Sequence, residues 1–168
     1  YTFQGDPAVR LFPVDKPDYH IANSGLFVES VEEGQTVTAD AERFKIGIHV
    51  SNFGITKEDP IKITVKRSFN SGSGGEKWYS EQIFDPVYYQ DTLYYLVETT
   101  EEDRKNAVGI NRFEVYLDRG NNIAEMNEGN NIASFEHIFP RSSIRLLSPE
   151  PYSIVSKQPV RLIAQNLD

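Results

Sequence analysis

The sequence of 168 residues predicts an all-β fold, an antiparallel sandwich of about seven strands. Several stretches alternate apolar and polar residues with a period of two, as strands do when one face is buried. Clusters of Gly, Asn, Asp and Ser separate these stretches and mark turns. No long stretch repeats apolar residues with the 3.6-residue period of an amphipathic helix.

The expected strands follow one another along the chain at short intervals. Residues 44–50 alternate Phe44, Ile46, Ile48 and Val50 with polar or small residues and end at a turn at 52–54. Residues 61–69 and 113–117 show the same alternation. Weaker strand patterns cover residues 19–30, 76–84 around Trp78, 92–99 and 131–139. The stretch 98–105 is polar enough for a short helical turn, but we interpret it as a loop. Short strands with turns at this spacing are typical of an immunoglobulin-like sandwich.

The flanks divide the chain into three predicted parts. Residues 1–16 do not fit the sandwich, and we expect them to be the tail of an upstream domain. Residues 17–139 form the sandwich. A new apolar pattern follows Pro140, and residues 140–168 are expected to start a further β module. The chain opens at Tyr1 and its only methionine is Met126, so we expect it to be a piece of a longer protein.

Composition excludes several classes of function. The formal net charge is −8, and a nucleic-acid-binding surface needs clustered Lys and Arg, so nucleic acid is not an expected partner. No apolar run approaches the roughly 18 residues of a membrane span. Cysteine is absent, which excludes a disulfide scaffold, a thiolate zinc site and a cysteine nucleophile in this chain.

Two motifs in the predicted sandwich resemble those of a known family. Residues 111–118 (Asn-Arg-Phe-Glu-Val-Tyr-Leu-Asp), followed by the Glu- and Asn-rich stretch 121–131, look like the C-terminal signature of the CARDB family of immunoglobulin-like domains. In that signature a strand ending in Asp leads through a turn to a final strand. Residues 48–54 (Ile-His-Val-Ser-Asn-Phe-Gly) resemble the family's upstream strand and turn. The resemblance covers roughly residues 18–139 and implies a non-catalytic accessory domain.

A shorter resemblance concerns the parent protein. Residues 3–11 (Phe-Gln-Gly-Asp-Pro-Ala-Val-Arg-Leu) are similar to the closing segment of gingipain-like (peptidase C25) catalytic domains. In large Bacteroidetes surface proteins of the type IX secretion system, such a domain can be followed by immunoglobulin-like modules. The resemblance therefore implies an extracellular or cell-surface location. The family's catalytic His and Cys match no position here.

The best candidate ligand site is an acidic and amide-rich cluster late in the sandwich. Asp118, Asn121, Glu125, Glu128 and Asn130 supply hard oxygen ligands within one short segment, as calcium requires. Their spacing is not that of an EF-hand loop. The same residue types also favour tight turns through bonds to their own backbone. The sequence leaves calcium binding and turn formation as alternatives.

Aromatic residues offer a second candidate site. Trp78, with its neighbours among residues 79–95, could present flat rings to sugars. Alternatively, the doublets Tyr88-Tyr89 and Tyr94-Tyr95 arise when one ring faces the core and its neighbour faces solvent.

Catalysis in this chain is not expected. The histidines His20, His49 and His137 lie far apart in sequence, and no G-x-S-x-G or H-E-x-x-H motif is present. We expect a module that spaces, orients or docks a larger exported protein, a cell-surface cysteine peptidase. Its partners would be neighbouring domains of the parent chain, a surface protein or a glycan. The alternative is an adhesive module that depends on calcium or binds carbohydrate, and no other cofactor is predicted.

Overall fold

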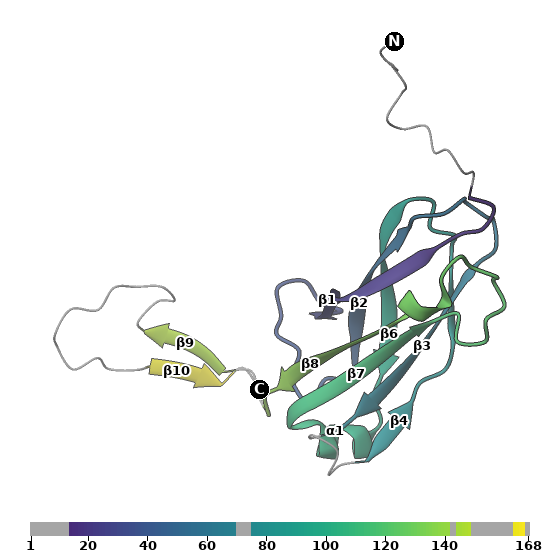
Figure 1. Cartoon of the computed structure of the whole chain (residues 1–168). Coiled ribbons are helices and arrows are strands. Elements are labelled where there is room, and N and C mark those ends of the chain that lie inside the picture. Colours follow the sequence, from purple (N-terminus) through teal and green to yellow (C-terminus); the bar gives the residue numbers. More distant parts are fainter. Residues whose placement is uncertain (1–13, 70–74, 142–143, 149–162, 167–168) are drawn as a thin grey trace.

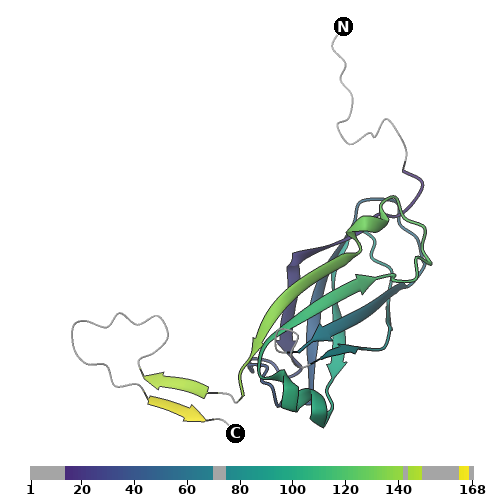
Figure 2. The same ribbon diagram turned by 60° about the horizontal axis from the view of Figure 1, so that its bottom comes forward.

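The computed structural model describes residues 14–69, 75–141, 144–148 and 163–166, and residues 14–69 and 75–141 form a two-layer sandwich. Figures 1 and 2 show the two antiparallel sheets packed face to face. The predicted all-β sandwich is confirmed. Each predicted strand is present, although the stretch 76–84 is divided into two short strands.

The smaller sheet has the order β1-β2-β6. Its strands are β1 (Tyr19–Ser30), β2 (Arg43–Asn52) and β6 (Gln90–Glu98). The register between β1 and β2 shifts between Ile21 and Leu26, so β1 carries an irregular segment in its middle. Side chains of β2 alternate between the core and the outer face, which is why the period-two pattern at 44–50 was readable from sequence.

The larger sheet has the order β4-β3-β7-β8, and β5 also pairs with β3. Its strands are β3 (Ile61–Ser68), β4 (Glu76–Trp78), β5 (Gln82–Phe84), β7 (Gly109–Leu117) and β8 (Ile132–Phe139). β4 and β5 lie one after the other along the same edge of β3. Between them the chain keeps one bond to β3, from Tyr79 N to Val65 O (2.9 Å).

The core lies between the two sheets and is built from the inward residues of both. Phe44, Ile46, Ile48 and Val50 of β2 are fully buried. The facing residues of β3 and β7 are also fully buried: Ile61, Ile63, Val65, Phe113, Val115 and Leu117. Removing this apolar surface from water is the main stabilising contribution to such a fold.

One charged residue, Arg67 of β3, occupies a core position and is 1% exposed. Its guanidinium carbon lies 4.5 to 5.6 Å from the ring centroids of four phenylalanines: Phe44, Phe69, Phe113 and Phe139. Its Nε donates to Asn111 Oδ1 (2.9 Å), while both Nη atoms have no hydrogen-bond partner among the described residues. Burial lowers the pKa of Arg67, and the nearby Tyr79 and Asp103 act against that shift.

The prediction of a loop at 98–105 is wrong, because α1 spans Glu101–Ala107. Thr100 and Asp103 form a capping box: Asp103 N donates to Thr100 Oγ1 (3.2 Å), and Thr100 N donates to Asp103 Oδ2 (2.7 Å). These bonds satisfy backbone N–H groups that a helix end leaves unpaired. A helix of 7 residues is too short to reveal an apolar period, so only the cap could have predicted it.

Beyond the sandwich, β9 (Ile144–Ser148) and β10 (Ile163–Asn166) pair antiparallel in a sheet of their own. That residues 140–168 begin a further module stays a prediction, as do the boundaries of the three predicted parts. Most of the segment 1–16 lies outside the described residues. None of the helices in the described ranges has the length and apolar character needed to span a membrane.

Candidate functional site

The carboxylate of Asp118 stabilises the turn at the start of the connection from β7 to β8. Asp118 and Asn121 both adopt positive φ angles, 42° and 48°, a conformation that Asp and Asn tolerate better than most residues. Asp118 Oδ2 accepts a hydrogen bond from Ile123 N (2.6 Å), and Oδ1 accepts one from Asn122 Nδ2 (3.0 Å). This carboxylate is buried and holds the turn that it begins.

Glu125 joins this connection to the start of β1. Its Oε2 accepts a hydrogen bond from Tyr19 N (2.7 Å), and its Oε1 accepts one from Asn131 Nδ2 (2.8 Å). Its own N–H donates to Glu128 Oε1 (2.9 Å). The side chain is 4% exposed, and burial raises the pKa of Glu125 to about 7. The two donors act against that shift, and the negative charges of Glu128 and Asp118 reinforce it.

Asn52, at the end of β2, binds the same N-terminal stretch from the other side. Its Oδ1 accepts hydrogen bonds from Asp18 N (3.1 Å) and Gly54 N (2.9 Å). Its Nδ2 donates to the carbonyl groups of Ile55 (3.1 Å) and Val87 (3.3 Å). One buried amide therefore ties together the N-terminal stretch, the turn after β2 and the loop before β6.

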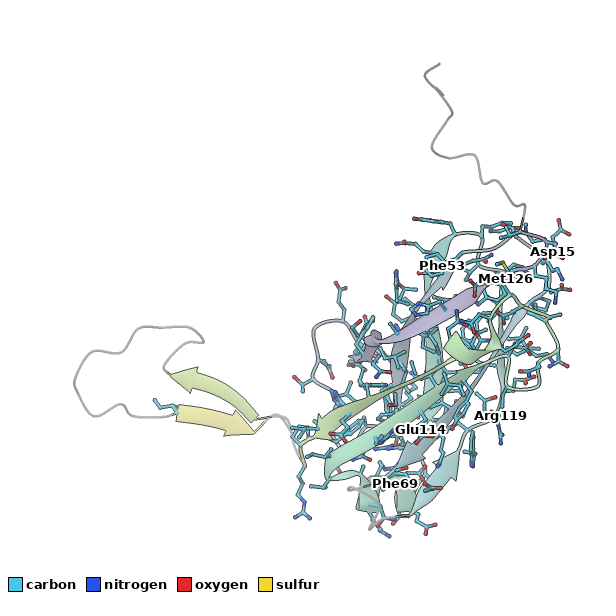
Figure 3. All side chains as sticks on the ribbon, in the orientation of Figure 1. Asp15, Phe53, Phe69, Glu114, Arg119 and Met126 are labelled. Carbon is cyan, nitrogen blue, oxygen red and sulfur yellow. The ribbon has the colours of Figure 1, made fainter. Side chains whose placement is uncertain are left out.

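Residues 16–19 each contribute at least one backbone group to such bonds. Further bonds run from Ile55 N to Lys16 O (3.0 Å), from Phe53 N to Asp18 O (2.9 Å), from Met126 N to Pro17 O (2.9 Å) and from Asn130 Nδ2 to Asp18 Oδ1 (3.0 Å). We call the hydrogen bonds between residues 16–19 and residues 52–55 and 125–130 the N-terminal clamp. Figure 3 shows Asp15, Phe53 and Met126 gathered at this end of the sandwich, with Phe69 at the opposite end.

Gly54 allows the close approach on which the N-terminal clamp depends. A Cβ atom at this position would lie 2.2 Å from Lys16 O, 2.6 Å from Pro17 C and 2.7 Å from Asp18 N. All three are backbone atoms, so no side-chain rotation could relieve the contact. The glycine in the predicted turn at 52–54 is therefore needed for packing against the N-terminal stretch.

The structure assigns hydrogen-bonding roles to most of the predicted calcium ligands. Asp118 and Glu125 are buried and use both carboxylate oxygens as acceptors, and Glu128 accepts from Glu125 N. Asn130 donates its Nδ2 to Asp18 Oδ1, while its own Oδ1 has no hydrogen-bond partner among the described residues. Asn121 is exposed and donates its backbone N–H to Asp118 O (2.8 Å). Across the described ranges, no three His, Cys, Asp or Glu residues are grouped so as to hold a metal ion. These contacts build the turns that the sequence offered as one of its two alternatives.

Calcium binding stays one of the two alternatives from the sequence, and thermal unfolding tests it. A cation that binds only the folded chain raises the temperature at the midpoint of unfolding when the cation concentration exceeds Kd. From the hydrogen bonds above we expect the unfolding curves in calcium and in chelator to coincide. If calcium raised the unfolding temperature of the wild-type chain but not that of Glu128→Gln, residues 118–131 would form a calcium site.

The raised pKa of Glu125 makes stability depend on pH. Because the folded-state pKa of about 7 exceeds the ordinary 4.5, the fold favours the neutral acid. The resulting stabilisation is fully present below about pH 4.5 and is lost as pH rises through 7. Glu125→Gln keeps the side-chain shape and removes the titration. We expect wild type, relative to this variant, to lose on the order of 2 kcal/mol of unfolding free energy between pH 5 and pH 8. Denaturant titration of both proteins at both pH values measures this, and parallel pH profiles would contradict it.

The most exposed large aromatic on the larger sheet, Trp78, is covered in part by its neighbours. The Arg119 guanidinium carbon lies 4.0 Å from the Trp78 ring, and Lys66 Nζ lies 5.8 Å from it. The Tyr116 ring packs beside it, with centroids 5.2 Å apart. A cation stacked on the indole competes with a sugar for the same ring, so this arrangement favours packing over a free stacking platform. Carbohydrate binding remains an untested alternative.

The two tyrosine doublets behave differently. In β6, Tyr94 is 47% exposed and Tyr95 is fully buried, which confirms the predicted alternation. The same prediction is wrong for Tyr88 and Tyr89, which are 65% and 71% exposed. These two residues lie in a bend before β6, where the strand alternation does not apply.

The three histidines lie on three different strands, β1, β2 and β8. His20 packs against the Phe53 ring, and His49 Nδ1 lies 3.3 Å from Thr92 Oγ1. His137 packs edge-on against Phe139, and burial, followed by the charge of Arg67, lowers the pKa of His137.

Comparison with known proteins places the fold. No family model matches the sequence, and no curated protein matches it. The chain is similar to the crystal structure of the CARDB domain of the PF1109 protein from Pyrococcus furiosus, which was determined in complex with di-metal ions. The match has 19% sequence identity and a TM-score of 0.52, and it covers 77% of this chain and 98% of that one. A solution NMR structure of the same domain matches at 19% identity with a TM-score of 0.43, over 75% of this chain and 97% of that one. The chain therefore has the immunoglobulin-like sandwich fold seen in a CARDB domain.

Proposed function

We propose that this chain is a non-catalytic accessory module that spaces and orients the parts of a larger protein on either side of its sandwich. The observation that carries the proposal is the N-terminal clamp. It fixes the direction in which the backbone leaves the sandwich, through bonds from two separate parts of the chain. A loosely attached module would need none of these bonds.

The opposite end of the sandwich is fastened as well. Ala39 N donates to Pro140 O (2.8 Å), directly after β8. Both views of the ribbon place the N-terminal stretch and the end of β8 at opposite ends of the sandwich (Figures 1 and 2). A strand of 8 residues such as β8 spans roughly 26 Å. The module would hold its neighbours apart by about this length and in a fixed relative direction.

The proposal extends to the identity of the neighbours. The resemblance of residues 3–11 to the end of a gingipain-like catalytic domain supports a cell-surface cysteine peptidase as the larger protein. That resemblance lies outside the described residues. On this proposal the chain is exported, and its direct partners are the neighbouring domains of its own polypeptide.

Distance measurements between spin labels test the orienting role. The chain has no cysteine, so introduced cysteines can be labelled selectively. One label replaces Asp15, just outside the clamp, and the other replaces Glu98 on β6; both side chains are exposed. We expect a narrow distance distribution for this pair. Glu125→Ala removes the acceptor of Tyr19 N and should widen the distribution about twofold.

A second labelled pair provides the control. Labels at Glu98 and Glu136 both lie on strands of the sandwich, so their distribution should stay narrow in Glu125→Ala. A broad distribution for the Asp15 pair in the otherwise wild-type chain would refute the orienting role. Hydrolysis of peptides by the purified chain would refute the non-catalytic part of the proposal.

A further inference from the structure

The smaller sheet ends at β6, whose outer edge has no strand neighbour among the described strands. In an antiparallel strand, alternate residues direct both backbone hydrogen-bonding groups to the same side. Leu96 directs its N–H and C=O away from β2, and by alternation Thr92 and Tyr94 do the same. Such an edge is a template for another strand, and natural proteins usually protect it.

The side chain of Gln82 occupies this edge at its centre. Gln82 belongs to β5 of the other sheet, and its amide makes both bonds that a neighbouring strand would make to Leu96. Its Nε2 donates to Leu96 O (2.6 Å), and its Oε1 accepts from Leu96 N (3.0 Å). At one end of the same edge, Thr92 N is bound by the side chain of Asp91 (2.7 Å).

The outer edge of β8, at the end of the larger sheet, is protected in a similar way. Asn23, in the irregular middle of β1, accepts a hydrogen bond from Ser134 N through its Oδ1 (2.8 Å). Each sheet therefore ends in a strand whose outward backbone is bound by a side-chain amide from the opposite sheet. This repetition indicates that the amides protect the edges.

We propose that Gln82 keeps the edge of β6 closed against a second copy of this chain. With its amide removed, two copies would pair antiparallel through β6, with Tyr94 opposite Tyr94 of the other copy. In this register Thr92 lies opposite Leu96 and Gln90 lies opposite Glu98, so each outward-directed residue finds an outward-directed partner.

The charges of β6 permit this register. Glu98 lies opposite Gln90, and Asp91 lies opposite Val97, so no two like charges are directly opposed. The side chains at the centre are aromatic and aliphatic, and Tyr94 and Leu96 are 47% and 37% exposed. Cross-strand aromatic and apolar pairs of this kind stabilise sheets.

Replacing the amide tests the proposal. Gln82→Ala leaves the backbone pairing of β5 with β3 in place and frees Leu96 N and O. Sedimentation equilibrium of the full chain should show wild type as a monomer of 19.1 kDa. The variant should dimerise, with an association constant at least tenfold higher than that of wild type. Gln35→Ala, which removes an amide bound to Glu32 in a loop, is the matched control and should stay monomeric.

A second substitution identifies the surface. Tyr94→Lys, added to Gln82→Ala, places two lysines opposite each other at the centre of the dimer and should restore the monomer. Circular dichroism and thermal unfolding establish that each variant is folded. Three results would overturn the proposal: a folded Gln82→Ala chain that stays monomeric, a wild-type chain that already dimerises, or a dimer that survives Tyr94→Lys.

Discussion

Gly54→Ala is expected to lower the free energy of unfolding by about 3 kcal/mol, a large loss for a single methyl group in a turn. The added methyl group would lie within 2.7 Å of three backbone atoms of residues 16–18. Because backbone atoms cannot rotate away, the turn or the N-terminal stretch must move. Either movement breaks bonds of the N-terminal clamp, beginning with the pair from Asn52 Oδ1 to Asp18 N and Gly54 N. Chemical denaturation measures the loss.

The same variant links stability to the proposed orienting role. Gly54→Ala should also widen the distance distribution of the Asp15 label, as Glu125→Ala does. Gly34→Ala is the control: no atom lies within 4 Å of the added Cβ, and only the positive φ of 76° opposes it. Its cost should be about 1–2 kcal/mol, with no effect on the label. Equal behaviour of the two variants would show that the contact with residues 16–18 carries no strain.

The second large effect is expected at Arg67. Arg67→Ala would leave a cavity among four phenylalanine rings and remove the donor to Asn111 Oδ1. We expect it to cost about 3–5 kcal/mol. Arg67→Met fills most of the same volume without a charge. Arg67→Met removes the same donor to Asn111 Oδ1, but both Nη atoms lack hydrogen bonds among the described residues, so the guanidinium is poorly compensated for its loss of water. The methionine variant should therefore cost only about 1–2 kcal/mol, less than Arg67→Ala.

A matched surface arginine provides the comparison. Arg112 of β7 has a side chain that is 53% exposed and lies 3.7 Å from Glu114, so Arg112→Ala should change stability by less than about 0.5 kcal/mol. If Arg67→Met proved as destabilising as Arg67→Ala, the cation–π contacts with the phenylalanines would outweigh the guanidinium's loss of hydration. In that case the buried charge would contribute to stability rather than oppose it.

Much of the fold follows from the sequence because strand alternation is local. Along residues 44–50 and 113–117, the alternation of apolar and polar residues shows which face of the strand is buried. This holds whichever strand becomes its neighbour in the sheet. The same alternation also contained a signal for Arg67 that our sequence analysis did not use. Arg67 is in phase with Ile61, Ile63 and Val65, and this phase predicts that its side chain faces the core. The capping box at Thr100 was likewise present but was outweighed by the polar composition of the helix.

The roles of the acidic and amide side chains could not be read in this way. The sequence showed that residues 118–131 are rich in hard oxygen ligands, which suits both a cation site and a network of turns. The hydrogen-bond partners of these side chains are distant in sequence: the partner of Glu125 is 106 residues away at Tyr19, and that of Asn130 is 112 residues away at Asp18. Gln82 and Leu96 form hydrogen bonds because β5 and β6 are edge strands of the two different sheets and lie on the same side of the sandwich.

The sequence by itself determined the fold class, the strands and the absence of a cysteine-based site, because these depend on local periodicity and composition. Only the tertiary structure decided which oxygen atoms are free and which strand edges are closed. A hydrogen bond depends on distances of about 3 Å between groups that packing brings together, and no spacing along the chain specifies them.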